Sequence, residues 1–192
     1  MDTYREVIES VKNLMKIKDN VIVAIDGRCG SGKTTLSARL ALEFDCNVFH
    51  MDDFFLPPQM RTAERLAEPG GNVHHERFLD EVIAPLLEGK PVCFKPYVCS
   101  NMAFGDLNCF ERKRLNVVEG SYSLHPSLRK AYDLKIFLTV DPLIQEKRIL
   151  QRSGSLKLMD FKTRWIPMEE FYFSELDVAG CCDLVVDTSG LN

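Results

Sequence analysis

The sequence predicts an α/β domain built on a parallel β-sheet, and three observations support this. Apolar runs rich in β-branched residues alternate along the chain with segments of helical periodicity. The first run, within residues 20–26, is continuous rather than alternating, which is typical of a strand buried on both faces. A glycine-rich loop over residues 27–34 joins that run to a helical segment, so the chain opens with a strand–loop–helix unit.

The expected elements follow from periodicity and from the residues that end each segment. Val7, Val11, Leu14 and Met15 recur at helical spacing and predict an amphipathic N-terminal helix. The other predicted helices cover residues 32–44, 75–89, 142–154 and 166–180. The predicted strands cover residues 20–26, 46–51, 114–120, 133–141 and 182–189, with a weaker strand at 91–97. Pro85 should end or kink the helix in which it lies.

The bulk composition is that of one domain spanning residues 1–192. Hydrophobic residues make up 45% of the 192 residues and charged residues 27%, with a formal net charge of -4. This acidic balance argues against binding to nucleic acid or to a membrane surface through a polybasic face. It remains compatible with a basic pocket for a small anion.

Cysteine use and the N-terminus point to a cytoplasmic protein. The chain has seven cysteines, an odd number without a CxxC pair, and we expect reduced thiols rather than a zinc ribbon or a disulfide framework. The first 20 residues mix acids with bases and lack the apolar core of a signal peptide. No apolar run approaches the roughly 20 residues that cross a bilayer.

Residues 27–34, GRCGSGKT, match the phosphate-binding pattern G-x-x-x-x-G-K-[ST] in full. Glycines let backbone N–H groups turn toward phosphate oxygens, and the next helix presents its positive end there. Lys33 supplies a mobile charge for the β- and γ-phosphates, and the Thr34 hydroxyl is a hard ligand for Mg²⁺. The predicted nucleotide-binding residues are Gly27, Arg28, Cys29, Gly30, Ser31, Gly32, Lys33, Thr34 and Thr35. The motif predicts a P-loop fold that binds a nucleoside triphosphate.

Other P-loop classes fit less well. The N-K-x-D motif with which Ras-type GTPases read the base does not occur in the sequence. Motor ATPases carry an apolar strand that ends in Asp-Glu, whereas the strand over residues 114–120 has Glu119 near its end. We interpret Glu119 as a Mg²⁺ ligand, direct or through water. The alternative is an ordinary acid at a strand end.

Several segments together resemble one family. VAIDGRCGSGKTTLSARL, HMDDFF, VVEG and a helix with spaced arginines occur in this order over residues 21–187 and are similar to the uridine kinase and nicotinamide riboside kinase group of P-loop kinases. The tail RWIPMEEFYF…CDLVVDTS also resembles bacterial uridine kinase-like proteins. The resemblance implies a five-stranded parallel sheet flanked by helices, with a small helical lid over about residues 148–165. It also implies ATP- and Mg²⁺-dependent phosphorylation of a primary hydroxyl, typically the 5′-hydroxyl of a ribonucleoside, and allows homo-oligomers.

Asp52 and Asp53 follow the second predicted strand, at the sheet edge where the phosphate loop should lie. A carboxylate at this edge can accept the proton of an attacking hydroxyl, and the resemblance assigns that role to Asp52. If the chain is still extended there, the Asp53 side chain points the other way. Asp53 would then support the loop or the following turn, and it is a weaker candidate for contact with the substrate.

Arg148 and Arg152 are four residues apart and share one face of their predicted helix. Lid arginines of the family close over the transferring phosphate, so the resemblance implies catalytic roles for both. Arg164 and Lys162 follow in the same lid, and Arg164 is a candidate substrate contact. Solvated arginines and a packed Trp165 are the alternative interpretations.

The acceptor end departs from the family pattern. His74 stands about where nucleoside kinases of the family have a ribose-binding aspartate, and Val98 follows Tyr97 where uridine kinases have an acid. The resemblance therefore supports kinase chemistry better than uridine specificity. The candidate acceptor residues are Phe54, Phe55, Arg61, Arg65, His74 and Tyr97. For the phenylalanines, core packing is the alternative.

We therefore expect a kinase of a nucleoside-like hydroxyl acceptor that uses ATP and Mg²⁺. A kinase of another acceptor, such as pantothenate, a sugar phosphate or a nucleoside monophosphate, stays open, and Arg61 and Arg65 would favour a phosphorylated one. A nucleotide-binding regulator without turnover is the alternative from a different class.

Overall fold

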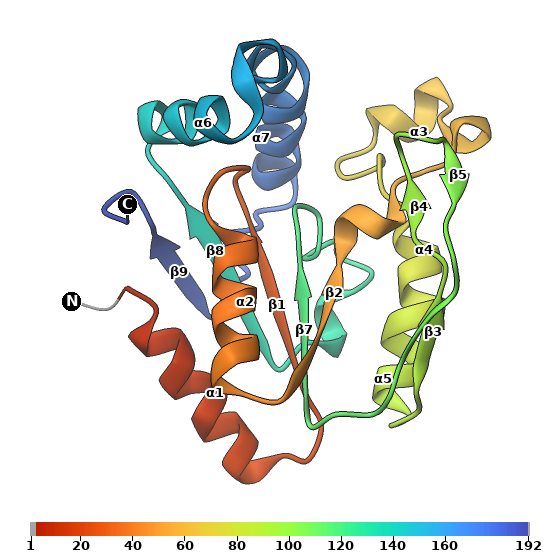
Figure 1. The fold of residues 1–192 in the computed structure, drawn as a ribbon, viewed down its shortest axis with the longest axis vertical. Helices are drawn as coiled ribbons and strands as arrows, with labels where there is room; N and C mark the ends of the chain where they lie inside the picture. Colours follow the sequence, from red (N-terminus) through yellow and green to blue (C-terminus); the bar gives the residue numbers. More distant parts are fainter. Residues whose placement is uncertain (1–2, 192) are drawn as a thin grey trace.

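A five-stranded parallel sheet lies at the centre of the computed structural model, which describes residues 3–191 (Figure 1). Its strands lie in the order β2 (Cys46–His50), β7 (Leu115–Glu119), β1 (Val21–Gly27), β8 (Leu134–Thr139) and β9 (Leu184–Asp187). Every neighbouring pair is parallel. The strands coincide with the predicted ones to within one or two residues at each end, so the predicted five-stranded parallel sheet is confirmed.

Two helices cover one face of the sheet (Figure 1). They are α1 (Arg5–Ile17) and α2 (Lys33–Glu43), which pack against Val21, Val23 and Ile25 of β1. Every residue of β1 is buried, as the continuous apolar run predicted. Both faces of this strand therefore pack in the core.

The opposite face packs against two other parts of the chain. Ile22 and Ala24 of β1 share a core with Phe78, from the segment between β2 and β7, and with Tyr172 of α7 (Ile166–Glu175). Because α7 directly follows the lid, this core ties the lid to the sheet. The other short helical turns are η1 (Met51–Phe54), η2 (Pro58–Met60), α3 (Ala63–Ala67) and η4 (Arg129–Ala131).

The helix predicted over residues 75–89 does not break at Pro85. It continues through α4 (His75–Phe78), a π-helical turn η3 (Leu79–Ile83) and α5 (Ala84–Leu87). Proline has no N–H to donate and its ring crowds the preceding turn. The wider π-helical turn just before Pro85 makes room for the ring. The helix therefore does not end at Pro85, and the distortion expected at the proline takes the form of a π-helical turn.

Four short strands lie outside the central sheet. β3 (Val92–Phe94) pairs with β6 (Asn108–Phe110), and β4 (Tyr97–Val98) pairs with β5 (Ala103–Phe104), both antiparallel. Together they form a hairpin flap over residues 92–110. The weak strand predicted at 91–97 therefore belongs to this flap and not to the sheet.

The flap holds the one disulfide among the described residues. Cys93 and Cys109 lie opposite each other in the β3–β6 pair and are bonded. The expectation of reduced thiols throughout is corrected at this pair. The two cysteines are 16 residues apart and meet only through the strand register, which their spacing does not reveal. The free cysteines are Cys29, Cys46, Cys99, Cys181 and Cys182.

The segment expected to form a lid, about residues 148–165, lies within α6 (Pro142–Asp160) and a π-helical turn, η5 (Phe161–Trp165), that runs into α7. Gly154 interrupts α6 with φ 80° and ψ 172°, so the helix predicted over residues 142–154 ends where expected and a second helical piece follows. Figure 1 shows α6 above the carboxyl ends of the strands. Within residues 3–191, no helix combines the length and apolar character needed to cross a membrane.

Candidate active site

The phosphate loop connects β1 to α2 at the carboxyl edge of the sheet. Gly27 has φ +137°, and a Cβ there would lie 2.1 Å from the Leu138 carbonyl oxygen, so no other residue fits. Gly32 has φ +93° and is the N-cap of α2. These two glycines let the loop curl tightly and place its N–H groups at the start of the helix.

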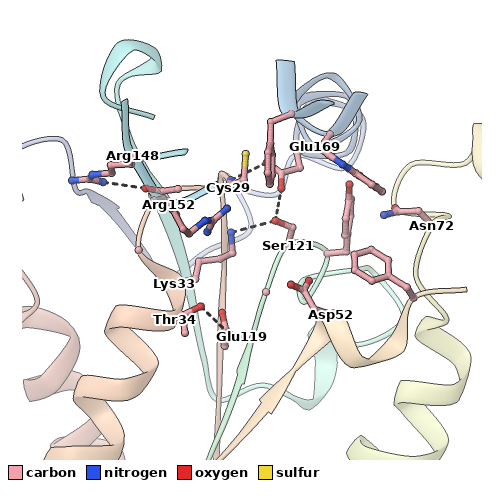
Figure 2. Close-up of a pocket in the computed structure, with 18 of the residues that line it drawn as sticks. Cys29, Lys33, Thr34, Asp52, Asn72, Glu119, Ser121, Arg148, Arg152 and Glu169 are labelled. Carbon is pink, nitrogen blue, oxygen red and sulfur yellow. Dashed lines mark hydrogen bonds between the residues drawn. The ribbon is translucent and has the colours of Figure 1, made fainter. Parts of the chain in front are cut away.

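Lys33 lies over this loop. Its Nζ donates to the carbonyl oxygens of Gly27 at 2.7 Å and Arg28 at 3.0 Å, and to Ser121 Oγ at 3.2 Å. Figure 2 shows the ammonium group pointing into the cavity beside Ser121. Its partners are neutral oxygens, so its charge is held ready for an anion rather than cancelled by a carboxylate in direct contact.

A cavity of about 940 Å³ opens in front of the loop. It is lined by residues 29–35 of the loop and α2 and by side chains from β7, the long loop after β2, the flap and the lid. A volume of this order suits a nucleotide together with a small acceptor. The cavity therefore gathers residues from every element that the sequence motifs had singled out.

Thr34 and Glu119 meet at the floor of this cavity. Thr34 Oγ1 lies 3.2 Å from Glu119 Oε1, and His50 Nδ1 lies 2.6 Å from the same oxygen. The hydrogen bond with the Glu119 carboxylate raises the pKa of His50. Thr34 and Glu119 offer adjacent hard oxygens, which is the donor set that Mg²⁺ prefers, so these residues fit the ion that the motif implies.

Asp52 faces the phosphate loop from the turn after β2 and lines the cavity. Asp52 is exposed at the cavity, and partial desolvation by the surrounding protein raises the pKa of its carboxyl. The charge of Lys33 opposes this rise, and the charge of Glu119 adds to it. Figure 2 shows Asp52 on the far side of Lys33 from the lid arginines.

Asp53 does not line the cavity. Desolvation raises the pKa of its carboxyl, and the charges of His50 and Arg77 oppose the rise. The two side chains therefore have different surroundings, as expected. Both residues lie within the 3₁₀ turn Met51–Phe54, however, and not in an extended strand.

Arg148 is held by the protein itself. Its guanidinium donates to the carbonyl oxygens of Gly30 (3.2 Å), Thr188 (2.7 Å) and Leu191 and to Thr188 Oγ1 (3.2 Å). Arg148 lines the cavity, but these N–H groups already connect the phosphate loop to the C-terminal segment through hydrogen bonds. A direct contact with a transferring phosphate would require these bonds to break.

Arg152 and Arg164 are less constrained. Arg152 lies over the Phe161 ring at 5.6 Å and Arg164 over the Trp165 ring at 4.5 Å, and both line the cavity. Lys162, the other basic residue predicted for the lid, instead pairs with Glu146 at 2.7 Å. Of the predicted lid cations, Arg152 and Arg164 are the ones whose charged groups remain available to the cavity.

The sequence motifs missed the link between α7 and the phosphate loop. Glu169 is buried, and its carboxylate accepts from Cys29 N at 2.9 Å and Ser121 Oγ at 2.6 Å. Glu170 pairs with Arg28 at 2.9 Å. Burial, followed by the charge of Glu169, raises the pKa of Cys29 to about 12, so its thiol is not a nucleophile. Glu169 and Glu170 belong to no recognisable sequence motif, so the sequence did not indicate that they contact the phosphate loop.

Two of the residues predicted to contact an acceptor lie away from the cavity, and other residues line it. His74 and Tyr97 do not line the cavity: His74 starts α4 with its backbone N–H on Phe54 O, and Tyr97 is buried against Phe104. Asn72 and Tyr122 line it instead, with Phe55 and Trp165, whose rings are 6.2 Å apart. Arg61 lines the cavity but Arg65 does not.

Comparison with known proteins supports the fold. No protein-family model matches the sequence, and no curated protein sequence matches it. Among solved structures, a possible uridine kinase from Bacillus stearothermophilus has a TM-score of 0.65 at 19% identity and covers 94% of this chain and 98% of that one. A candidate fructose transport system kinase from Silicibacter sp. TM1040 has a TM-score of 0.65 at 20% identity, with 96% and 98% covered.

A more distant structure has the same architecture. YFH7 from Saccharomyces cerevisiae, a candidate P-loop kinase with a circular permutation, has a TM-score of 0.61 at 12% identity, with 97% and 98% of the two chains covered. The chain therefore has the fold of P-loop kinases over nearly its whole length. The first two of these structures are named for different substrates, uridine and fructose, so the shared fold does not define a substrate for this chain.

Proposed function

We propose that this protein is a kinase that transfers the γ-phosphoryl group of ATP, with Mg²⁺, to a hydroxyl group of a small nucleoside-like acceptor. The main support is that Asp52 shares one cavity with Lys33 and Thr34, at the edge where β1 and β2 both end. A carboxylate with a raised pKa opposite a phosphate loop suits proton abstraction from a hydroxyl.

The phosphate end of the proposed reaction uses the loop and its neighbours. The backbone N–H groups of the loop and the Lys33 ammonium would bind the β- and γ-phosphates, with Lys33 exchanging carbonyl contacts for phosphate oxygens. Thr34 and Glu119 would hold Mg²⁺. When bound, Mg²⁺ neutralises phosphate charge and orients the leaving group. Ser121 keeps Lys33 at the mouth of the loop.

Asp52 would act on the acceptor. The acceptor oxygen attacks the γ-phosphorus, the new O–P bond forms, the bond to the ADP oxygen breaks, and the hydroxyl proton passes to the Asp52 carboxylate. A raised pKa makes this carboxylate a better proton acceptor than a solvated one. Arg152 and Arg164 would face the developing phosphoryl charge from the lid. Arg148 is better placed to position the loop, because its N–H groups already hold Gly30.

A screen of acceptors tests this proposal. Consumption of ATP with Mg²⁺ is measured against nucleosides, free sugars, pantothenate, sugar phosphates and nucleoside monophosphates. Phosphorylation of a hydroxylated acceptor, with its product identified by mass spectrometry, is the expected result. Tight ATP binding without turnover of any acceptor would contradict the proposal and favour a regulator. Since ATP is the expected donor, we place the reaction in the cytoplasm.

A further inference from the structure

Three buried polar atoms at the acceptor end of the cavity lack a partner. Asn72 Oδ1, Asn72 Nδ2 and the Tyr122 hydroxyl have no partner with hydrogen-bond geometry among residues 3–191, although the Asn72 amide lies close enough to the phenol to lower its pKa. Asn72 is 8% exposed and Tyr122 is 3% exposed, and both line the cavity. Buried polar groups without partners destabilise a fold, so a pair of them facing one cavity indicates a ligand.

The Asn72 side chain is presented by a rigid loop. The Arg65 guanidinium donates to the carbonyl oxygens of Gly71 and Val73, on both sides of Asn72, each at 3.1 Å. The Asn72 carbonyl oxygen accepts from Leu56 N at 3.1 Å. The backbone around this amide is therefore fixed at several points, while its side chain is left for the cavity (Figure 2).

Tyr122 is presented by a strained backbone. Its φ is +76°, a left-handed conformation that aromatic residues rarely adopt. The buried Asp26 carboxylate stabilises this conformation by accepting from Tyr122 N at 3.2 Å and Leu124 N at 2.9 Å. The same carboxylate accepts from Gly27 N of the phosphate loop, so the tyrosine and the loop share one anchor.

On the basis of the proposed function, we propose that Asn72 and Tyr122 form an acceptor subsite that selects an uncharged, polyhydroxylated molecule. The amide offers one acceptor and two donors, and the phenol offers one of each, which matches neighbouring hydroxyl groups. Phe55 and Trp165 supply an apolar wall for the rest of the acceptor.

The charges around the subsite favour a neutral acceptor. Arg65 was a candidate for binding a phosphorylated acceptor. Its guanidinium instead donates to the carbonyl oxygens of Gly71 and Val73 and to the Glu76 carboxylate, the last at 2.7 and 2.9 Å. Burial, followed by the charge of Glu169, raises the pKa of Tyr122, and the nearby Asn72 amide opposes that rise. Glu169 therefore places a negative charge near the Tyr122 phenol, which disfavours an anionic group next to it, whereas Arg164 lies over Trp165 on another side of the cavity. Arg61 also lines the cavity, so anionic probes belong in the test.

The test combines two variants with one matched control. Tyr122→Phe and Asn72→Leu remove the unpaired polar groups with little change in shape. Tyr132→Phe removes a buried hydroxyl that donates to Ser123 O at 2.9 Å outside the cavity. Binding of uridine, D-fructose, uridine monophosphate, fructose 6-phosphate and pantothenate is measured by calorimetry in the presence of a non-hydrolysable ATP analogue, and turnover is measured separately with ATP.

Among the probes, we expect a neutral one to bind the wild type most tightly. Its affinity should fall tenfold or more in Tyr122→Phe and in Asn72→Leu, while both variants keep the ATP affinity and melting temperature of the wild type. Tyr132→Phe should lower the melting temperature and keep probe affinity. If neutral probes bind in this pattern but are not phosphorylated, the kinase proposal fails and the subsite stands. Preferred binding of an anionic probe, equal binding to the variants and the wild type, or binding of no probe would overturn the subsite.

Discussion

Asp26 is a fully buried carboxylate at the end of β1, next to the phosphate loop. It accepts hydrogen bonds from Gly27 N, Tyr122 N, Leu124 N and the Tyr172 hydroxyl. Burial nevertheless raises its pKa to about 6. The Asp26 side chain thus connects three parts of the chain: the phosphate loop, the loop that follows β7, and helix α7. Its raised pKa means that it loses its proton at a higher pH than an exposed aspartate.

The raised pKa of Asp26 makes stability depend on pH. Because the folded protein binds this proton more tightly than the unfolded chain, the group's contribution falls as pH rises from about 4 to 6. The loss is on the order of 3 kcal/mol in the free energy of unfolding. Asp26→Asn should remove this part of the pH dependence. Urea denaturation of both proteins at several pH values measures it.

The quantity to compare is the difference between the wild-type and Asp26→Asn curves of unfolding free energy against pH, because titration of His125 changes stability with pH in the opposite direction. Burial lowers the pKa of His125 to about 4, so its contribution is lost as pH falls from about 6.5 toward 4. Asp106→Asn, at an exposed site, is the control and should change stability by less than about 0.5 kcal/mol. Parallel curves for Asp26→Asn and the wild type would refute the assignment.

At the scale of elements, two π-helical turns recur in the same setting. η3 ends two residues before Pro85, and η5 ends two residues before Pro167. Each wide turn lets a helix pass a proline that cannot donate to the helical ladder. Helical periodicity predicts that a helix exists, but it does not predict that one of its turns widens. For this reason the sequence alone indicated that the helix ends or kinks at Pro85.

Gly154 lets the lid change direction within α6. Its φ of 80° and ψ of 172° belong to a region that only glycine adopts readily, whereas a Cβ at this position would have no atom within 4 Å. Gly154→Ala should therefore lower the free energy of unfolding by about 1–3 kcal/mol through backbone strain alone. Thermal and urea denaturation measure this change, with the exposed Lys157→Ala as control. A gain of about 1 kcal/mol, as for a glycine inside a regular helix, would contradict the kink.

Glu169 places a buried negative charge against the phosphate loop, through Cys29 N and Ser121 Oγ. Glu169→Gln removes the charge and keeps the shape, so ATP should bind about tenfold more tightly, because the phosphates lose a repelling neighbour. Calorimetry measures the affinity. Glu170→Gln, at a half-exposed pair with Arg28, should change it less. Weaker ATP binding to Glu169→Gln would show that the carboxylate instead organises the loop for phosphate.

At the scale of the whole molecule, the parallel sheet explains why motifs far apart in sequence meet. β1, β2 and β7 end at one edge, so Lys33, Asp52 and Glu119 line one cavity. The strand pattern and the P-loop motif predicted this convergence. They did not predict Asn72, Tyr122 or Glu169, because those roles depend on loop conformation and burial rather than on spacing. The resemblance pointed to His74, but the chain turns into α4 there and presents Asn72 instead.

The central claim is that Asp52, and not its neighbour Asp53, takes the proton of the acceptor. Turnover and ATP affinity are compared for Asp52→Asn and Asp53→Asn with the acceptor that the screen identifies. Asp52→Asn should lower kcat by about 100- to 10,000-fold and leave ATP affinity nearly unchanged, whereas Asp53→Asn should reduce stability more than rate. Wild-type kcat in Asp52→Asn, or a larger loss of kcat in Asp53→Asn, would contradict the account.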